Sequence, residues 1–82
     1  MIVDLSTVSD KRIIKTSVDN EEVYIQINFL EYYNNYVLII LDNSGNTIKS
    51  TWLSEGINHY YNVNQNLSGT VNGGILTIVG IS

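Results

Sequence analysis

Tyr36 to Trp52 reads YVLIILDNSGNTIKSTW, and the rest of the chain is organised around this stretch. Its first part, Tyr36 to Leu41, is a run of six apolar residues rich in β-branched side chains. Such a run is too short for a buried helix and is typical of a strand that is covered on both faces. Asp42 to Asn46 follows with the residue types that tight turns favour, because they tolerate positive φ or hydrogen-bond to nearby backbone.

The second part of the stretch, Thr47 to Trp52, alternates in character as a half-buried strand does. One face carries Ile48, Ser50 and Trp52, and the other carries Thr47, Lys49 and Thr51. We expect the face with Thr47 to be in water. The whole stretch is therefore predicted to be a β-hairpin at the centre of a small all-β domain.

Strand patterns recur on both sides of this hairpin. Val23 to Leu30 alternates strictly between apolar and mixed positions, and Arg12 to Val18 precedes it across a turn. Ile75 to Ile81 is a further strand, preceded by Asn72-Gly73, a favoured hairpin turn. We predict a small single-domain antiparallel sandwich, or a partly open barrel, of about six to seven short strands. Residues 10–82 form the domain, and residues 1–9 are an N-terminal arm or an edge strand.

The composition indicates a domain that associates with other protein. The 82 residues include no cysteine and one histidine, so neither a disulfide nor a zinc site is expected to stabilise the fold. Charged residues make up 15% against 44% hydrophobic ones, whereas about a quarter is usual for charged residues. A small domain with so few charges is expected to have part of its surface covered by partners. The net charge of −4 argues against nucleic acid, and neither a membrane span nor a secretory signal is expected.

No combination of residues indicates catalysis or a cofactor. His59 has no cysteine or activated serine to work with, and we expect it to be a polar surface or hydrogen-bonding residue. The stretch from Asp42 to Asn46 lacks the alternating acidic ligands of a calcium loop and is better explained as a turn. We therefore expect a protein without enzymatic activity, metal or cofactor.

Two groups of residues are candidates for contact with partners. The first five residues are apolar but lie outside the strand pattern, so their removal is expected to leave the isolated fold nearly unchanged. The aromatic residues form either a carbohydrate or partner surface, or a buried Trp52 with tyrosines around it. Val23 to Leu41 is expected to make mainly internal contacts. The candidate interface residues are Ile2, Val3, Leu5, Tyr32, Tyr33, Trp52, Tyr60 and Tyr61.

The order of these motifs resembles that of the baseplate plug protein family of cyanophage-like contractile tails. The matching segments are Tyr24 to Phe29, Asn35 to Asp42, Gly45 to Ile48, Leu53 to Asn58 and Gly74 to Leu76. Together they span about residues 10 to 80. One difference is that the chain contains no proline.

The resemblance implies a non-enzymatic component of a phage, or of a phage-tail-like particle, that plugs or caps the end of the tail tube near the hub. The implied partners are hub, spike and tube proteins and further copies of the chain. The implied location is the virion, with assembly in the host cytoplasm. The alternative is a small β-sandwich module that binds carbohydrate or peptide through Trp52 and the tyrosines.

Overall fold

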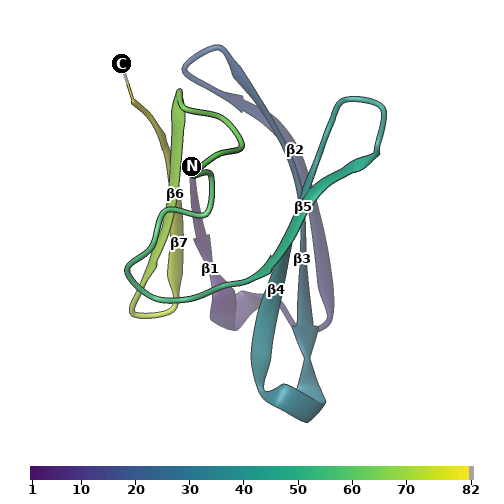
Figure 1. The fold of residues 1–82 in the computed structure, drawn as a ribbon. Helices are drawn as coiled ribbons and strands as arrows, with labels where there is room; N and C mark the ends of the chain where they lie inside the picture. The colour runs from purple at the N-terminus through teal and green to yellow at the C-terminus, as the bar shows by residue number, and fades with distance from the viewer. Residues whose placement is uncertain (82) are drawn as a thin grey trace.

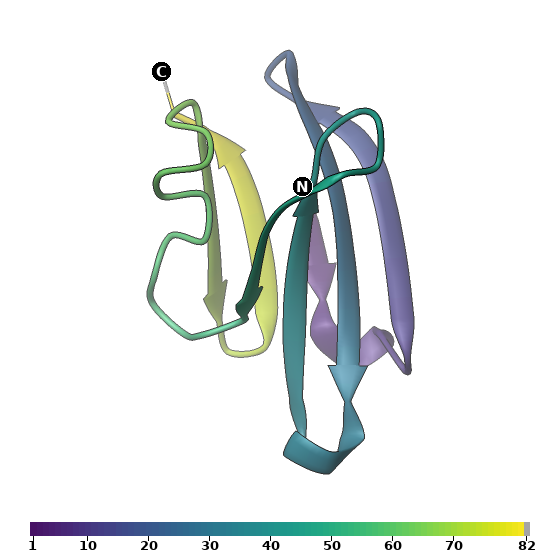
Figure 2. The same cartoon turned by 45° about the vertical axis from the view of Figure 1, so that its right-hand side comes forward.

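The computed structural model describes residues 1–81, which form seven strands in two antiparallel sheets that pack face to face (Figures 1 and 2). This arrangement confirms the predicted small all-β sandwich. Single 3₁₀ turns lie at Leu5–Thr7 and Glu31–Tyr33. The strands are β1 (Ile2–Asp4), β2 (Lys11–Val18), β3 (Glu21–Leu30), β4 (Asn35–Leu41), β5 (Thr47–Trp52), β6 (Leu67–Asn72) and β7 (Ile75–Gly80).

The four-stranded sheet is a meander with the order β2-β3-β4-β5. Asp19 and Asn20 connect β2 to β3, and both have positive φ (50° and 67°). Two residues with positive φ give a hairpin turn whose twist matches that of the strands, and Asp and Asn tolerate this conformation. The turn chemistry of the sequence thus sets the register of the first hairpin.

The three-stranded sheet has the order β1-β7-β6, so that segments from the two ends of the chain pair with each other. Gly73 and Gly74 (φ 59° and 76°) form the turn between β6 and β7. The sequence placed this hairpin turn one residue earlier, at Asn72-Gly73. The glycine pair takes the turn because both central positions of such a turn need positive φ.

The core lies between the two sheets and is built from alternate residues of β3, β4, β6 and β7, together with the N-terminal segment and the loop after β5. In β3 and β4 the inward side chains of Val23, Ile25, Ile27, Leu38 and Ile40 are at most 2% exposed. The loop between β5 and β6 adds Leu53, His59 and Tyr60 to this layer. The buried apolar residues are Val3, Leu5, Val8, Val23, Ile25, Ile27, Leu38, Ile40, Leu53, Tyr60, Leu67, Val71, Leu76 and Ile78.

The predicted central hairpin is displaced by one strand. β3 and β4 are the inner pair of their sheet, and β5 is an edge strand. The inward face of β5 is also the opposite of the one expected, because Lys49 pairs with the buried Ile40 while Trp52 points outward and is 41% exposed. The register decides this: a bulge between Ile40 and Leu41 shifts the pairing by one residue.

The N-terminal residues belong to the sheet and to the core. β1 pairs with β7 as an edge strand, and Val3 and Leu5 are each 4% exposed. The Leu5 N–H donates to the Gly74 carbonyl (2.9 Å), and the Tyr36 hydroxyl donates to the Leu5 carbonyl (2.8 Å). The expectation that residues 1–5 are dispensable for the fold is therefore wrong, because their apolar side chains fill the space between the sheets.

Candidate functional site

The most distinctive surface is the face of the four-stranded sheet that points away from the three-stranded sheet, which we call the outer face. Residues that pair across neighbouring strands lie side by side on the same face of a sheet, so the register defines this surface. Its three rows are Lys11, Asn28, Val37 and Trp52; Ile13, Gln26, Ile39 and Ser50; and Lys15, Tyr24, Leu41 and Thr47.

The outer face is apolar along β4 and uncharged at its centre. Val37, Ile39 and Leu41 are half-buried by their neighbours, and Ile13 on β2 is 53% exposed. The central polar groups are the amides of Gln26 and Asn28, with Gln26 Nε2 donating to Asn28 Oδ1 (2.9 Å). An outer sheet face in water normally carries polar residues, so the outer face is more apolar than such faces usually are.

Three aromatic rings extend this face at one end, and we call them the aromatic cluster. Tyr33 contacts Trp52 edge-on with ring centroids 5.4 Å apart, and Tyr32 contacts Tyr33 in the same way at 5.0 Å. The 3₁₀ turn after β3 positions both tyrosines beside the end of β5. Tyr32 is 91% and Tyr33 62% exposed, so the cluster presents a large amphipathic surface to its surroundings.

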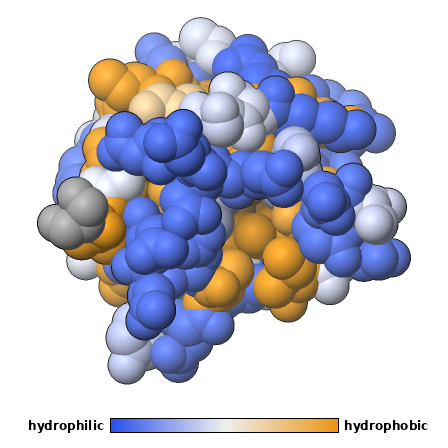
Figure 3. All heavy atoms as spheres, turned by 90° about the horizontal axis from the view of Figure 1, so that it is seen from above, coloured by the Kyte–Doolittle hydropathy of each residue, from blue (hydrophilic) through white to orange (hydrophobic). Residues whose placement is uncertain are grey.

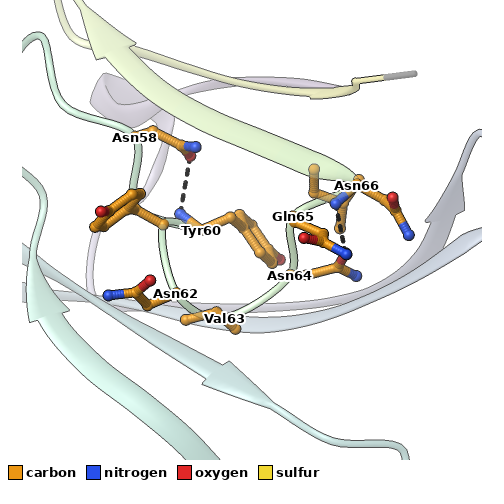
Figure 4. A pocket seen from close by; sticks show the side chains of 9 residues that line it. Asn58, Tyr60, Asn62, Val63, Asn64, Gln65 and Asn66 are labelled. Atoms are coloured by element: carbon orange, nitrogen blue, oxygen red, sulfur yellow. Dashed lines mark hydrogen bonds between the residues drawn. The ribbon is translucent and has the colours of Figure 1, made fainter.

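The loop from Asn58 to Leu67 encloses an open hollow of about 680 Å³ (Figure 4). Asn58 shapes its wall, because its Oδ1 accepts hydrogen bonds from the backbone N–H groups of Tyr60 and Gly69, both at 2.9 Å. Tyr61 is 70% exposed at the hollow, whereas Tyr60 is 2% exposed and belongs to the core. Burial raises the pKa of Tyr60 to about 12.

His59 fastens this loop to β6 and is 1% exposed, so it is a hydrogen-bonding residue of the interior and not of the surface. The Ser54 N–H donates to Nε2 (3.0 Å), which fixes the neutral tautomer with the proton on Nδ1. Nδ1 then donates to the Gly69 carbonyl (2.8 Å). Both ring nitrogens are engaged in holding the loop, and neither is directed at a substrate or a metal.

The acidic side chains around the end of the sandwich that carries the β2–β3 and β4–β5 turns also serve the fold. Seen from above, polar side chains surround a depression with apolar residues inside it (Figure 3). Glu21 accepts hydrogen bonds from Asn66 (2.6 Å) and Asn64 (3.5 Å), which ties the loop before β6 to the opposite sheet. Among residues 1–81 no group of three or more His, Cys, Asp or Glu side chains could hold a metal ion.

Asp42 organises the β4–β5 turn. Its Oδ1 accepts from the N–H groups of Asn46 (2.8 Å) and Ser44 (2.9 Å), and the hydrogen bond from the Asn46 N–H is the main cause of its lowered pKa. The carboxylate therefore works as a backbone acceptor that closes the turn.

The structure places the eight candidate interface residues in three environments. Tyr32, Tyr33 and Trp52 come together in the aromatic cluster, while Ile2 (73% exposed) and Tyr61 lie apart from it. Val3, Leu5 and Tyr60 are corrections: they are buried between the sheets and do not reach a partner.

Sequence reasoning missed the outer face itself. Val37 and Ile39 were assigned to internal contacts, and Ile13 was not among the candidates. Two features of the sequence point to this face: the unbroken apolar run in β4, and the position of Ile13 on the lysine-bearing side of β2.

Comparison with known proteins gave no match: no family model, no curated protein and no solved structure matched the chain. In the part of the chain that the structure describes, no helix is long and apolar enough to cross a membrane.

Proposed function

We propose that this chain is a non-catalytic structural protein that assembles with other proteins through its outer face. Its specific place is the baseplate of a phage or phage-tail-like particle, where it closes the end of the tail tube near the hub. The chain then acts in the virion and is assembled in the host cytoplasm. The resemblance of its ordered motifs to baseplate plug proteins supports this place.

The observation that carries the assembly role is the apolar row Val37, Ile39 and Leu41 on the outer face. Interfaces between proteins have cores depleted in charge and rims that are polar and solvent-accessible. The outer face has the same anatomy: its centre is apolar or amide, and Lys11 and Lys15 lie along the β2 edge. Polar groups elsewhere, such as His59 and Asp42, are engaged in internal hydrogen bonds.

Co-expression with tail hub, spike and tube proteins, followed by affinity purification, tests this role. Wild-type protein should co-purify with at least one of them, and Ile39→Lys should not, because it places a charge at the centre of the outer face. Val79→Lys is the matched control, since Val79 is an exposed strand residue of the other sheet (47%). Failure of the wild-type protein to co-purify with any tail protein contradicts the proposal.

Binding of carbohydrate or peptide is the second candidate function, and the aromatic cluster favours it. Exposed aromatic rings at fixed positions offer faces and edges on which sugars or apolar side chains pack. Trp52 is the single tryptophan, so its fluorescence reports on this site directly. Titration with a panel of oligosaccharides should change the Trp52 emission of the wild-type protein, and the change should be smaller for Tyr33→Ala. Tyr61→Ala is the control and should respond as the wild type does. An unchanged emission with every oligosaccharide and peptide excludes this candidate.

A further inference from the structure

The outer face is a mostly apolar surface that the described residues leave without a covering layer. In Figures 1 and 2 the three-stranded sheet lies against one side of the four-stranded sheet, and no element lies against the other side. The run Tyr36 to Leu41 nevertheless has the composition of a strand covered on both faces. Whatever covers the second face therefore lies outside residues 1–81.

The edges of the sheets do not offer an easier route for a partner. The loop after β5 runs along β6, where the Gly56 N–H donates to Val71 and the His59 N–H to Gly69. β1 has only three residues, and β5 carries the bulge next to Leu41. Short strands, bulges, covering loops and lysines are the features that prevent an added strand. The last of these features occurs in β2, which carries Lys11 and Lys15 on its outward side. Because all four edge strands are protected in one of these ways, association through a face of the sheet is favoured over addition of a partner's strand.

The central amides make the outer face complementary to itself. Gln26 and Asn28 each carry both donors and acceptors, so they can pair with the same amides of a second copy. The apolar side chains on either side, Ile13 and Ile39, then pack on apolar side chains of that copy. No charge lies in the central row, so two copies can meet without burying an unpaired charge.

The charges at the rim of the face have both signs. Lys11 and Lys15 follow the β2 edge, while Glu22 and the Asp42 turn lie at one end of the face. A copy rotated by 180° can place opposite charges near each other at this rim. A partner with a surface of a single sign would meet repulsion from one of the two groups.

The size of the face is sufficient for a reversible dimer. Four strands about 4.8 Å apart and six residues long cover a footprint of about 20 Å by 20 Å. With the relief of the side chains, two such faces bury about 1,000 Å² in total, which is the lower limit for a specific interface. An interface of this size lies at the small, transient end of the range, and we expect its dissociation constant to be micromolar.

We infer that the outer face is the contact between two copies of this chain, packed face to face about a two-fold axis. This inference rests on the proposed assembly role: the outer face joins two copies of the chain, and the tail proteins bind the dimer that results. The two four-stranded sheets form a second sandwich across the axis, with Trp52 at its margin. Each assembled unit is then four layers thick, with the three-stranded sheets outermost.

Sedimentation velocity on the purified chain tests the inference, over concentrations from about 1 µM to about 200 µM on either side of the expected dissociation constant. Wild-type protein should shift from monomer to dimer over this range, and Trp52 emission should move to longer wavelength on dilution. Ile39→Lys should raise the dissociation constant about 100-fold or more, and its melting temperature should equal that of the wild type when both are measured well below the dissociation constant of the wild type. The charge-matched Val79→Lys should dimerise as the wild type does.

The possible outcomes separate the inferred dimer from the proposed place in the baseplate. A wild-type chain that stays monomeric at about 200 µM, the highest concentration of the experiment, does not form the face-to-face dimer. If that monomer still co-purifies with tail proteins and Ile39→Lys does not, the outer face belongs to a different protein and the assembly role stands. A dimer that Ile39→Lys leaves intact is formed by another surface. A dimer that depends on Ile39 but co-purifies with no tail protein upholds the inference and refutes the proposed place in the baseplate.

Discussion

Leu5→Ala distinguishes a core residue from a partner contact. Leu5 follows β1, is 4% exposed and packs between the two sheets. The substitution leaves the backbone hydrogen bonds of Leu5 to Gly74 and Tyr36 in place, so that it removes only side-chain packing. It therefore measures how much the N-terminal segment contributes to the sandwich.

The expected loss in free energy of unfolding is about 2–5 kcal/mol, because truncation of a buried leucine loses transfer free energy and leaves a cavity. A domain of this length has about 4–12 kcal/mol in total, at about 0.05–0.15 kcal/mol per residue. Urea unfolding followed by circular dichroism measures the change. With a slope of about 1 kcal/mol/M, the midpoint should fall by about 2 M or more at an unchanged slope.

Ile2→Ala is the matched control, since Ile2 lies in the same strand but is 73% exposed. Its effect should stay within about 0.5 kcal/mol. Equal effects of the two substitutions refute the reasoning. So does a Leu5→Ala protein with wild-type stability that no longer joins its partners, because Leu5 would then serve the interface and not the core.

Three further predictions concern charge and protonation. Ile40→Asp should prevent folding, because it buries an unpaired carboxylate at a position only 2% exposed, at a cost of several kcal/mol. Thr47→Asp, on the exposed side of β5, should give a wild-type circular dichroism spectrum. Equal behaviour of the two variants contradicts the strand register. Tyr60 has its pKa raised from 10.0 to about 12, so the unfolded chain ionises first and stability should fall as pH rises from about 10 to about 12. Tyr60→Phe should reduce this fall in urea midpoints measured at pH values across that window, and an identical alkaline loss in the variant shows that another group is responsible. Because the pKa of Asp42 is lowered in the folded chain, its carboxylate stabilises the fold at pH values above the ordinary pKa of 3.8, and this contribution should disappear as the pH falls below 3.8. Asp42→Asn should therefore lose less stability between neutral and acidic pH than the wild type does. An equal loss in both proteins refutes the role of Asp42 in this turn.

The sequence predicted the fold class because strand periodicity and turn chemistry are local properties. The alternation from Val23 to Leu30 appears in the structure as predicted. The turn predicted over Asp19 to Glu22 is shorter, because Glu21 and Glu22 already belong to β3 and only Asp19 and Asn20 form the turn. Ile25 and Ile27 lie on the apolar side of this alternation and are fully buried. The prediction and the structure differ where the outcome depends on distant parts of the chain, namely on which side of a strand faces the other sheet.

β5 shows why that choice escaped prediction. Its alternation favours Ile48 and Trp52 as the inward residues, because they are the apolar ones. The bulge beside Leu41 and the pairing of Lys49 with Ile40 place them outward instead. The aliphatic stem of Lys49 covers the core from the edge while its amine approaches the His59 carbonyl (3.5 Å). A bulge depends on the partner strand, so the sequence of β5 alone does not reveal it.

The exposure of the candidate interface residues was predicted only in part, for a related reason. Exposed aromatic residues were identified correctly at Tyr32 and Tyr33, since turn residues are exposed in most folds. The burial of Val3 and Leu5 depends on β7, which follows about seventy residues later in the chain. A short apolar segment looks the same in sequence whether it fills its own core or a partner's groove.

The pairing of β1 with β7 also determines the order of events in time when the chain folds. The Met1 ammonium donates to the Ile78 carbonyl across a separation of 77 positions, whereas β2 to β5 pair only with their neighbours in sequence. Hairpins between neighbours form in about 1–10 µs, while closure of distant strands is slow because chain entropy must be lost first. A nascent chain therefore has its meander before it has its second sheet, and β1 waits for β7 to be synthesised. Until then the second sheet does not cover the apolar inner sides of β3 and β4, and exposed apolar surface of this kind promotes aggregation.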